Sequence, residues 1–317
     1  MSTAFLYADL EEENYVDIPE GVALAREGDM VWRLRKCLYG LKQSPRMWNQ
    51  TIDRLLKKLG FTQLVTEYGI YVRGEGDDRV FLALYVDDLL LVWLNEGSLM
   101  SVKGGLSDNY KMKDLGSAKY LLGVEIRRRS GRGYFIVQET YAREVVEKFG
   151  MGEARVASTP FEHCVYLVGA GMEGDPAMAG IPCRSVVGSL MYLAVCTRPD
   201  LAMAVSTLSS FCLAPRLEHW EAAKRVLRYP KGTAGEGLGY SPGEDLAVWG
   251  YSDASYGSDV ETMRGRSGHL YMSGGAALSW GSKVQDVVAL SSTEAEYMAM
   301  TSAVQEGLVR VAAICQL

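Results

Sequence analysis

The stretch that decides the fold reads Val80-Phe-Leu-Ala-Leu-Tyr-Val-Asp-Asp-Leu-Leu-Leu-Val-Trp93, an apolar run interrupted by two adjacent aspartates, Asp87 and Asp88. β-Branched and aromatic residues on both sides predict strands at 80–86 and 89–93, with the aspartates where the strand pair must turn. The run is too short to span a bilayer. It therefore predicts a β-hairpin that carries carboxylates at its tip.

Carboxylates at such a tip indicate a divalent metal. Ionised groups beside an apolar core lose hydration unless they are paired or bound to a cation. Successive side chains of a hairpin alternate in direction, so we assign Asp87 as the main ligand and Asp88 as its partner. Mg²⁺, or Mn²⁺ in its place, is the ion that nucleotidyl transfer requires. An Asp-rich turn that binds nothing is the alternative.

The remaining patterns predict an α+β protein in three parts. Helices are expected at 44–60, 98–109, 140–149, 185–196, 199–212 and 218–229 and from about 292, and further strands at 69–73, 120–126, 134–138, 246–252, 269–272 and 277–280. From 158 to 182 the composition shifts to Gly, Pro, Ala and Met without periodicity, which is typical of a linker. The expected domains are 1–157, 158–235 and 236–317.

The composition does not identify a nucleic-acid binder. Lys and Arg total 33 against 39 Asp and Glu in 317 residues, so the net charge is -6. Basic residues still cluster at 33–46, 127–132 and 224–231, where they could hold phosphates or only face solvent. The six cysteines have no paired spacing, which indicates neither a zinc site nor a disulfide framework and fits a reducing compartment. We expect no secretory signal and no membrane segment.

A family resemblance adds specificity to the acidic hairpin. Seven segments resemble copia-type reverse transcriptase in order and spacing: Thr3-Ala-Phe-Leu6, Asp9-Leu-Glu-Glu-Glu13, Pro19-Glu-Gly21, Leu38-Tyr-Gly-Leu-Lys-Gln-Ser-Pro-Arg46, Tyr85-Val-Asp-Asp88, Met112-Lys-Asp-Leu-Gly116 and Leu122-Gly-Val-Glu-Ile126. The resemblance implies a reverse-transcriptase palm in which Asp87 and Asp88 are the catalytic metal ligands. It also implies an RNA template, a DNA primer and a deoxynucleoside triphosphate as partners.

The resemblance assigns further substrate contacts. Phe5 would lie beneath the incoming sugar, although core packing is the alternative. Gly40 permits a close backbone approach, or only a turn, while Lys42 and Arg46 could meet phosphates. The 122–126 segment resembles the primer grip, although an edge strand would look the same. The implied substrate-binding set is Phe5, Gly40, Lys42, Gln43, Arg46, Tyr85 and Gly123.

The second half resembles the helical connection and the start of a ribonuclease H domain. The segments are Ser158-Thr-Pro160, Val187-Gly-Ser-Leu-Met-Tyr192, Thr197-Arg-Pro-Asp200, Gly250-Tyr-Ser-Asp253, Ser267-Gly-His-Leu-Tyr271 and Ala289-Leu-Ser-Ser-Thr-Glu-Ala-Glu-Tyr297. Asp253 and Glu296 match the family's metal ligands for hydrolysis of an RNA–DNA hybrid, or they are a solvated pair. Ser291 and Glu294 form a capping-box pattern, so we expect Glu294 to bind backbone donors. Pro230 should end its helix at Tyr229.

The limits of the chain suggest a fragment truncated at both ends. In this family the first catalytic aspartate precedes the Thr-Ala-Phe-Leu threonine by three residues, whereas only two residues precede Thr3. The later ribonuclease H carboxylates would lie beyond Leu317. We therefore expect negligible polymerase and hydrolase activity, with a non-catalytic nucleic-acid-binding or scaffold remnant of a transposon as the alternative. Intracellular placement is expected, in cytoplasmic virus-like particles or the nucleus, and the oligomeric state is open.

Overall fold

The computed structural model describes residues 3–22, 30–129, 133–162, 167–169, 175–244 and 246–315. The chain divides into two compact units. The second unit is Lys119–Ala312, and the first comprises Met1–Ala118 with the last five residues, Ala313–Leu317. Each unit mixes helices with antiparallel sheets, which confirms the predicted mixture of helix and strand.

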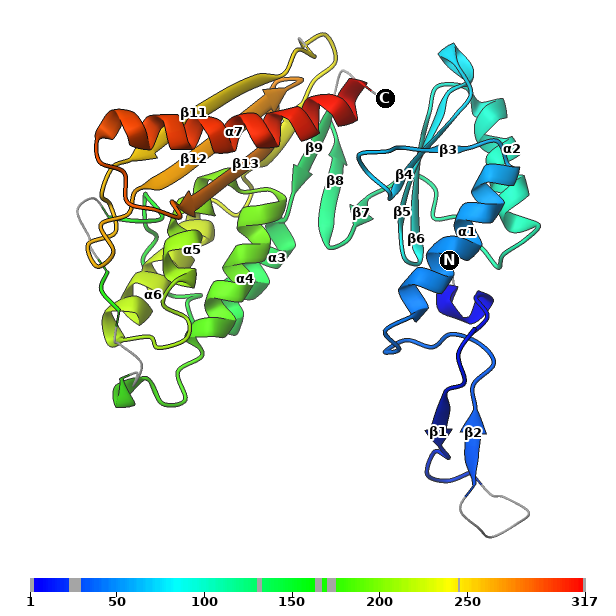
Figure 1. The fold of residues 1–317 in the computed structure, drawn as a ribbon, viewed down its shortest axis with the longest axis horizontal. Helices are drawn as coiled ribbons and strands as arrows, with labels where there is room; N and C mark the ends of the chain where they lie inside the picture. Colours follow the sequence, from blue (N-terminus) through cyan, green and yellow to red (C-terminus); the bar gives the residue numbers. More distant parts are fainter. Residues whose placement is uncertain are drawn as a thin grey trace. The chain divides into compact units, whose positions relative to one another are not determined.

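The first unit is a four-stranded sheet with two helices and a projecting ribbon (Figure 1). The sheet has the order β3-β4-β5-β6, and β1 pairs with β2 in the ribbon. Its elements are η1 Ala4–Tyr7, β1 Tyr15–Asp17, β2 Val31–Arg33, α1 Ser44–Lys58, β3 Thr62–Gln63, β4 Ile70–Arg73, η2 Gly76–Asp78, β5 Val80–Tyr85, β6 Asp88–Trp93 and α2 Glu96–Ser107.

Helix α1 packs its apolar stripe into the core of this unit. Trp48, Ile52 and Leu56 are buried in one cluster with Tyr71 and Leu82 of the sheet. The helix starts with Pro45 in its first turn and ends before Gly60, as the sequence predicts. Gly60 has φ +85°, and its N–H donates to the carbonyl of Lys57 at 3.1 Å. Helix α1 is thus a fixed base for the β5–β6 hairpin.

The described part of the second unit contains two sheets and the five α-helices α3 to α7. Its elements are β7 Tyr120–Leu121, β8 Val124–Arg128, β9 Tyr134–Val137, α3 Glu139–Lys148, η3 Pro176–Met178, α4 Cys183–Cys196, η4 Pro199–Leu201, α5 Ala202–Ser209, α6 Leu217–Gly232, β10 Gly237–Tyr240, β11 Trp249–Ser255, β12 Arg266–Ser273, β13 Ala276–Val284 and α7 Ser292–Cys315. One sheet has the order β10-β9-β8-β7, and the other β11-β12-β13.

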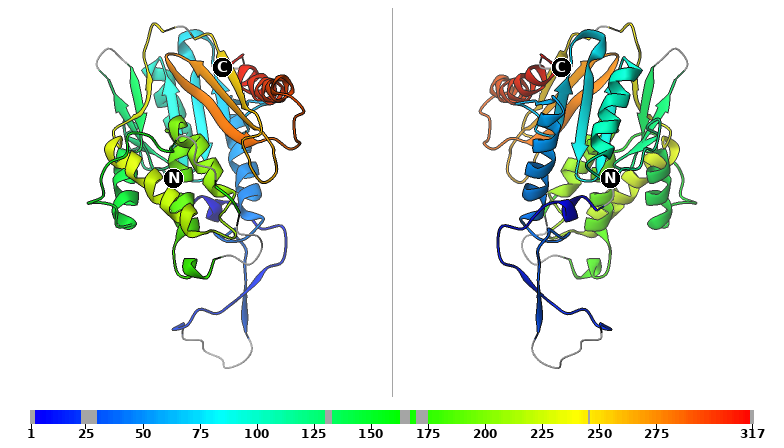
Figure 2. Two further views of the ribbon diagram at one scale, coloured as in Figure 1. Left: turned by 90° about the vertical axis from the view of Figure 1, so that its left-hand side faces the viewer. Right: turned by 90° about the vertical axis from the view of Figure 1, so that its right-hand side faces the viewer.

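Helices lie against both faces of the β12–β13 part of the β11–β13 sheet (Figures 1 and 2), whereas nearly every residue of the edge strand β11 is exposed. On one face, the Tyr271 hydroxyl donates to the carbonyl of Ala303 in α7 at 2.5 Å. On the other, the Trp280 indole donates to the carbonyl of Ala194 in α4 at 2.7 Å. Strands β12 and β13 therefore lie between α7 on one face and α4 and α5 on the other, since the Ser206 hydroxyl of α5 also donates to the carbonyl of Ser282 in β13 at 2.7 Å.

Two sequence predictions differ from the structure, and one strand was not predicted. The 120–126 stretch is not one strand but the hairpin β7–β8, because Leu122 and Gly123 take φ +51° and +76° in a two-residue turn. Helix α6 does not end at Tyr229 but continues through Pro230 to Gly232. A proline in the last turn removes a single backbone donor, so the helix can close around it. Strand β10 was not expected.

Strand β10 changes how the chain divides. It pairs with β9 from Gly237↔Val137 to Tyr240↔Tyr134. A segment predicted for the first domain therefore shares a sheet with one predicted for the third. The limits at 157 and 235 stay sequence-based predictions, while the compact units meet between Ala118 and Lys119.

No helix in the described part of the chain combines the length and apolarity needed to cross a membrane.

Candidate active site

The aspartates form the acidic turn, defined here as residues 85–88. Tyr85 and Asp88 are the last paired residues of β5 and β6, so Val86 and Asp87 make a two-residue loop. Val86 takes φ +50°, a left-handed conformation that costs a β-branched residue about 1–3 kcal/mol. The indole of Trp48, 2% exposed, donates to the carbonyl of Val86 at 2.9 Å. Helix α1 thereby holds the strained turn in place.

Both oxygens of the Asp87 carboxylate are held by donors from distant segments. The N–H of Ala4 donates to Oδ1 at 3.0 Å, and the Tyr39 hydroxyl donates to Oδ2 at 2.6 Å. Asp88 is exposed, and no hydrogen bond or ion pair within the described ranges involves its side chain. The two aspartates thus differ in environment, while the assignment of Asp87 as main metal ligand stays a prediction.

Tyr39 is a component of the site that sequence reasoning missed. Desolvation, followed by the hydrogen bond to Asp87, raises the pKa of Tyr39 to about 12, so the hydroxyl remains a donor at neutral pH. Its ring packs on Phe5 with centroids 4.5 Å apart. Phe5 is 6% exposed and belongs to the core, so the core-packing alternative describes its position here. Its predicted contact with an incoming sugar is untested.

Trp48 was expected only as an apolar position of its helix. A buried indole N–H needs an acceptor, and this requirement is the signal that could have linked Trp48 to a turn. Tyr39 offered no comparable signal, because a tyrosine next to a glycine in a loop is common.

The basic clusters differ in how many of their Lys and Arg side chains already bind other groups of the protein. On α6, Arg225 pairs with Glu162 at 2.7 Å, and Arg228 and Lys231 donate to the carbonyls of Arg155 and Ala154 at 2.5 and 2.7 Å. This cluster fastens the preceding segment to the helix. In the second cluster, Arg127 bridges Glu125 and Glu139, Arg129 lies over Phe135, and Arg132 is outside the described residues.

Two cations at the start of α1 remain available for a ligand. Lys42 and Arg46 are exposed, and neither forms an ion pair with any described residue. Gln43 is half-buried at the N-cap of α1 without a side-chain cap bond. Gly40 takes φ +97°, which requires glycine, and a Cβ there would meet open space. The Lys42–Arg46 segment begins three residues after Tyr39, so these cations lie on the same loop and helix start as the residue that donates to Asp87.

Gly123 has a packing requirement of its own. A Cβ at this position would come within 2.7 Å of the Tyr192 hydroxyl. That hydroxyl donates to the carbonyl of Leu122, so α4 fixes the tip of the β7–β8 hairpin. The predicted contact of Gly123 with a primer stays untested.

The second carboxylate pair lacks a comparable frame. Asp253 and Glu296 are exposed. Tyr251, Leu270 and Trp280 are cross-strand neighbours, so their side chains share the sheet face that contacts α4. Asp253 is two residues after Tyr251 on the same strand and therefore lies on that face as well. Glu296 belongs to α7, which covers the other face. The register therefore gives no support to a shared ion, and no described group of three or more His, Cys, Asp or Glu could hold a metal.

Glu294 has the structural role that the sequence predicts. Its own N–H donates to the Ser291 hydroxyl at 3.1 Å, and its carboxylate accepts the N–H of Leu290 at 2.6 Å. Ser291 thus caps α7, and the prediction that Glu294 binds a backbone donor is confirmed, although the donor is Leu290, one residue before the N-cap of a standard capping box.

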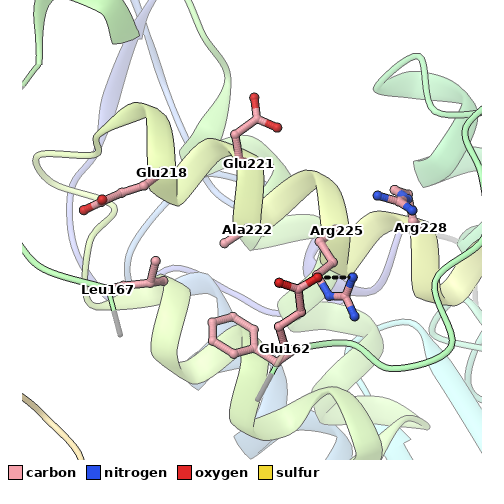
Figure 3. Close-up of a pocket in the computed structure, with 8 residues that line it drawn as sticks. Glu162, Leu167, Glu218, Glu221, Ala222, Arg225 and Arg228 are labelled. Atoms are coloured by element: carbon pink, nitrogen blue, oxygen red, sulfur yellow. Dashed lines mark ion pairs between the residues drawn. The ribbon is translucent and has the colours of Figure 1, made fainter. Parts of the chain in front are cut away.

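A pocket of about 440 Å³ lies along α6, and none of its lining residues is a predicted site residue (Figure 3). Its lining comprises Phe161, Glu162, Leu167, Glu218, Glu221, Ala222, Arg225 and Arg228. The Arg225–Glu162 ion pair crosses it. Its charges are mixed, and Arg225 and Glu162 already neutralise each other.

Comparisons with known proteins agree with the motifs. The model of the reverse transcriptase (RNA-dependent DNA polymerase) family matches residues 1–163. The chain is 42% identical over 312 residues to the retrovirus-related Pol polyprotein of transposon TNT 1-94 from Nicotiana tabacum, covering 96% of this chain and 23% of that protein. It is 35% identical to a transposon Ty5-1 protein of Saccharomyces cerevisiae, covering 96% of this chain and 99% of the relative. It is 34% identical to the Pol polyprotein of transposon RE2 from Arabidopsis thaliana, covering 96% of this chain and 21% of that protein. The chain thus spans about a quarter or less of the two plant Pol polyproteins.

Proposed function

Because the chain belongs to the reverse transcriptase family of copia-type retrotransposon Pol polyproteins, we propose that its acidic turn is a divalent-metal centre for RNA-directed DNA synthesis. The observation that carries the proposal is the Asp87 carboxylate, held by the Ala4 N–H and the Tyr39 hydroxyl on a turn fixed by Trp48. A solvated Asp-rich turn would need none of these three contacts.

The residues of the turn fit Mg²⁺ or Mn²⁺. Mg²⁺ in polymerase sites is commonly bound by one or two carboxylates and substrate phosphates rather than by a protein cage. Asp87 and Asp88 would hold the ion, and their oxygen atoms are the ligands it prefers. When bound, the ion stabilises the attacking 3′-oxygen and the leaving pyrophosphate. Lys42 and Arg46 would bind phosphates of the template or of the incoming nucleotide.

Cation binding tests this proposal directly. We expect electron paramagnetic resonance titration of the full chain to detect bound Mn²⁺, and we expect Asp87→Asn to remove that site. Asp77→Asn is the matched control, because Asp77 lies in η2 of the same unit. Equal Mn²⁺ binding by wild type and Asp87→Asn would contradict the proposal. Primer extension on an RNA template with Mg²⁺ then measures whether the centre supports synthesis.

Two other functions from the sequence receive less support. Hydrolysis of RNA–DNA hybrids through Asp253 and Glu296 would require the two carboxylates to share a metal ion, and both are exposed side chains that form no hydrogen bond or ion pair with a described residue. A non-catalytic nucleic-acid-binding remnant would use Lys42 and Arg46 without the acidic turn. In that case Asp87→Asn would leave hybrid binding unchanged both with and without Mg²⁺, whereas a metal centre makes binding Mg²⁺-dependent.

A further inference from the structure

We propose that Tyr39 is the positioning residue of the acidic turn, because its hydroxyl fixes the Asp87 carboxylate in the orientation that binds a cation. The inference rests on the proposed function and adds a residue to it. Tyr39 would not touch the ion but would act through Asp87, as hydrogen-bonded partners of metal-binding carboxylates commonly do.

The two donors to Asp87 act on different oxygens and come from different segments. Ala4, in η1, binds Oδ1, and Tyr39, in the loop before α1, binds Oδ2. The terminal torsion of an aspartate is broad, so one donor alone would leave the carboxylate free to rotate about its last bond. With both donors in place the plane of the carboxylate is set, because it cannot rotate without losing one of these bonds.

The two donors differ in how firmly they are held. Ala4 is fully buried, so its N–H is fixed by the core. Tyr39 is largely exposed and depends on its neighbours: Phe5 packs on its ring at 4.5 Å, and Gly40 turns the chain directly after it. The Ser44 hydroxyl donates to the carbonyl of Leu38 at 2.6 Å and closes this loop. Phe5 thereby supports Asp87 indirectly, through the tyrosine ring.

The orientation of Asp87 therefore depends on a hydroxyl that can be removed without disturbing the core. Tyr39→Phe keeps the ring that packs on Phe5 and deletes only the donor to Oδ2. Tyr15→Phe is the matched control, because the Tyr15 hydroxyl donates to a carboxylate oxygen of Glu13 at 3.2 Å on the exposed β1 strand. Both changes remove one tyrosine–carboxylate hydrogen bond, but only one of them lies at the acidic turn.

The experiment measures Mn²⁺ affinity of the full-length chain by electron paramagnetic resonance. Loss of an outer partner of a metal ligand costs about 10- to 100-fold in metal affinity, and we expect about tenfold for Tyr39→Phe. Tyr15→Phe should match wild type, and Phe5→Leu should fall between them. The bound-Mn²⁺ spectrum should also change in Tyr39→Phe, which a purely structural role would not cause at an unchanged melting temperature.

The opposite result has a clear meaning. If Tyr39→Phe binds Mn²⁺ equally or more tightly with an unchanged melting temperature, the hydroxyl does not position Asp87, and the inference is overturned. If Asp87→Asn binds Mn²⁺ as wild type does, the proposed function itself fails, which a separate variant reveals. If Tyr39→Phe lowers the melting temperature, Phe5→Leu decides between the two readings. Weaker Mn²⁺ affinity in a stable Phe5→Leu chain would still support the positioning of Asp87 through Phe5 and Tyr39. Unchanged Mn²⁺ affinity would overturn it.

Discussion

The acidic turn and the Asp253–Glu296 pair are both acidic, yet the protein surrounds them differently. At the acidic turn, Asp87 accepts two hydrogen bonds, and Trp48 holds the backbone of its neighbour Val86. Asp253 lies on the exposed edge strand β11, and neither its side chain nor that of Glu296 on α7 forms a hydrogen bond or ion pair with a described residue. A sequence motif therefore identifies the carboxylate, but only the surrounding contacts determine whether its orientation is fixed so that it can bind a ligand.

The largest effect that could break this comparison concerns Trp48. Truncation to Trp48→Ala should cost about 3–5 kcal/mol of unfolding free energy, because the buried ring and the bond to Val86 are both lost. Trp280→Ala should cost less, since Trp280 is only half-buried although it also donates to a carbonyl. Hydrogen exchange of peptides covering 80–93 and 266–284 reports the two effects separately. Equal losses of unfolding free energy in the two variants would contradict the idea that Trp48 holds the acidic turn more firmly than Trp280 holds its sheet.

A second prediction sharpens the comparison through the basic residues. The double change Lys42→Ala with Arg46→Ala should reduce the salt slope of RNA–DNA hybrid binding by about 1.8, because two phosphate contacts are lost. Lys224→Ala with Arg228→Ala is the control. Lys224 pairs with Glu221 and Arg228 holds a backbone carbonyl, so the slope should stay nearly constant. Fluorescence anisotropy at several salt concentrations measures both slopes, and a larger change in the control would reverse the assignment.

A third prediction uses the carboxylate that anchors α7. The Ser279 hydroxyl, followed by Arg310, holds the pKa of Glu306 below its ordinary value despite partial burial. A lowered folded-state pKa means that this stabilisation is complete above the unfolded pKa of about 4.5 and is lost as pH falls through the folded pKa. Glu306→Gln should therefore be about 1 kcal/mol less stable at pH 7 and flatter below pH 5. Urea unfolding at several pH values tests this, and parallel pH profiles would exclude the role.

The smallest expected effect is at the second pair itself. Asp253→Asn and Glu296→Gln should change Mn²⁺ affinity less than about twofold, because an exposed acid with no second carboxylate beside it binds a divalent ion weakly. The titration used for Asp87→Asn measures this as well. A tenfold loss of Mn²⁺ affinity in either variant would show that Asp253 and Glu296 do form a metal site. The acidic turn and this pair would then no longer differ in metal binding.

Much of the first unit follows from local patterns in the sequence. The helix of Ser44–Lys58 and the hairpin around Asp87 are predictable because apolar spacing and turn residues agree there. The sequence also indicates that Ser291 caps α7 and that Glu294 binds a backbone donor there. The prediction places both aspartates in the turn, but Asp88 opens strand β6. Pairing register decides such a one-residue shift, and it is not visible in composition.

The contacts of the site were less predictable because they are long-range. Tyr39 lies 48 positions from Asp87, and Ala4 lies 83 positions from it. No periodicity links such residues, so only the fold brings them together. Pro230 shows the complementary limit: the sequence rule is sound for a helix interior, but the last turn of α6 tolerates proline.

The pairing of β9 with β10 has a practical consequence for dissecting this chain. A piece ending at residue 157 would retain β9 but lose its neighbour along Gly237–Tyr240, leaving a row of free amide and carbonyl groups open to intermolecular association. Ending the piece at residue 118 instead preserves every strand pair of the β3–β6 sheet. Because no described strand pair crosses residue 118, limited proteolysis near this position could release a fragment that keeps the whole β3–β6 sheet and Asp87.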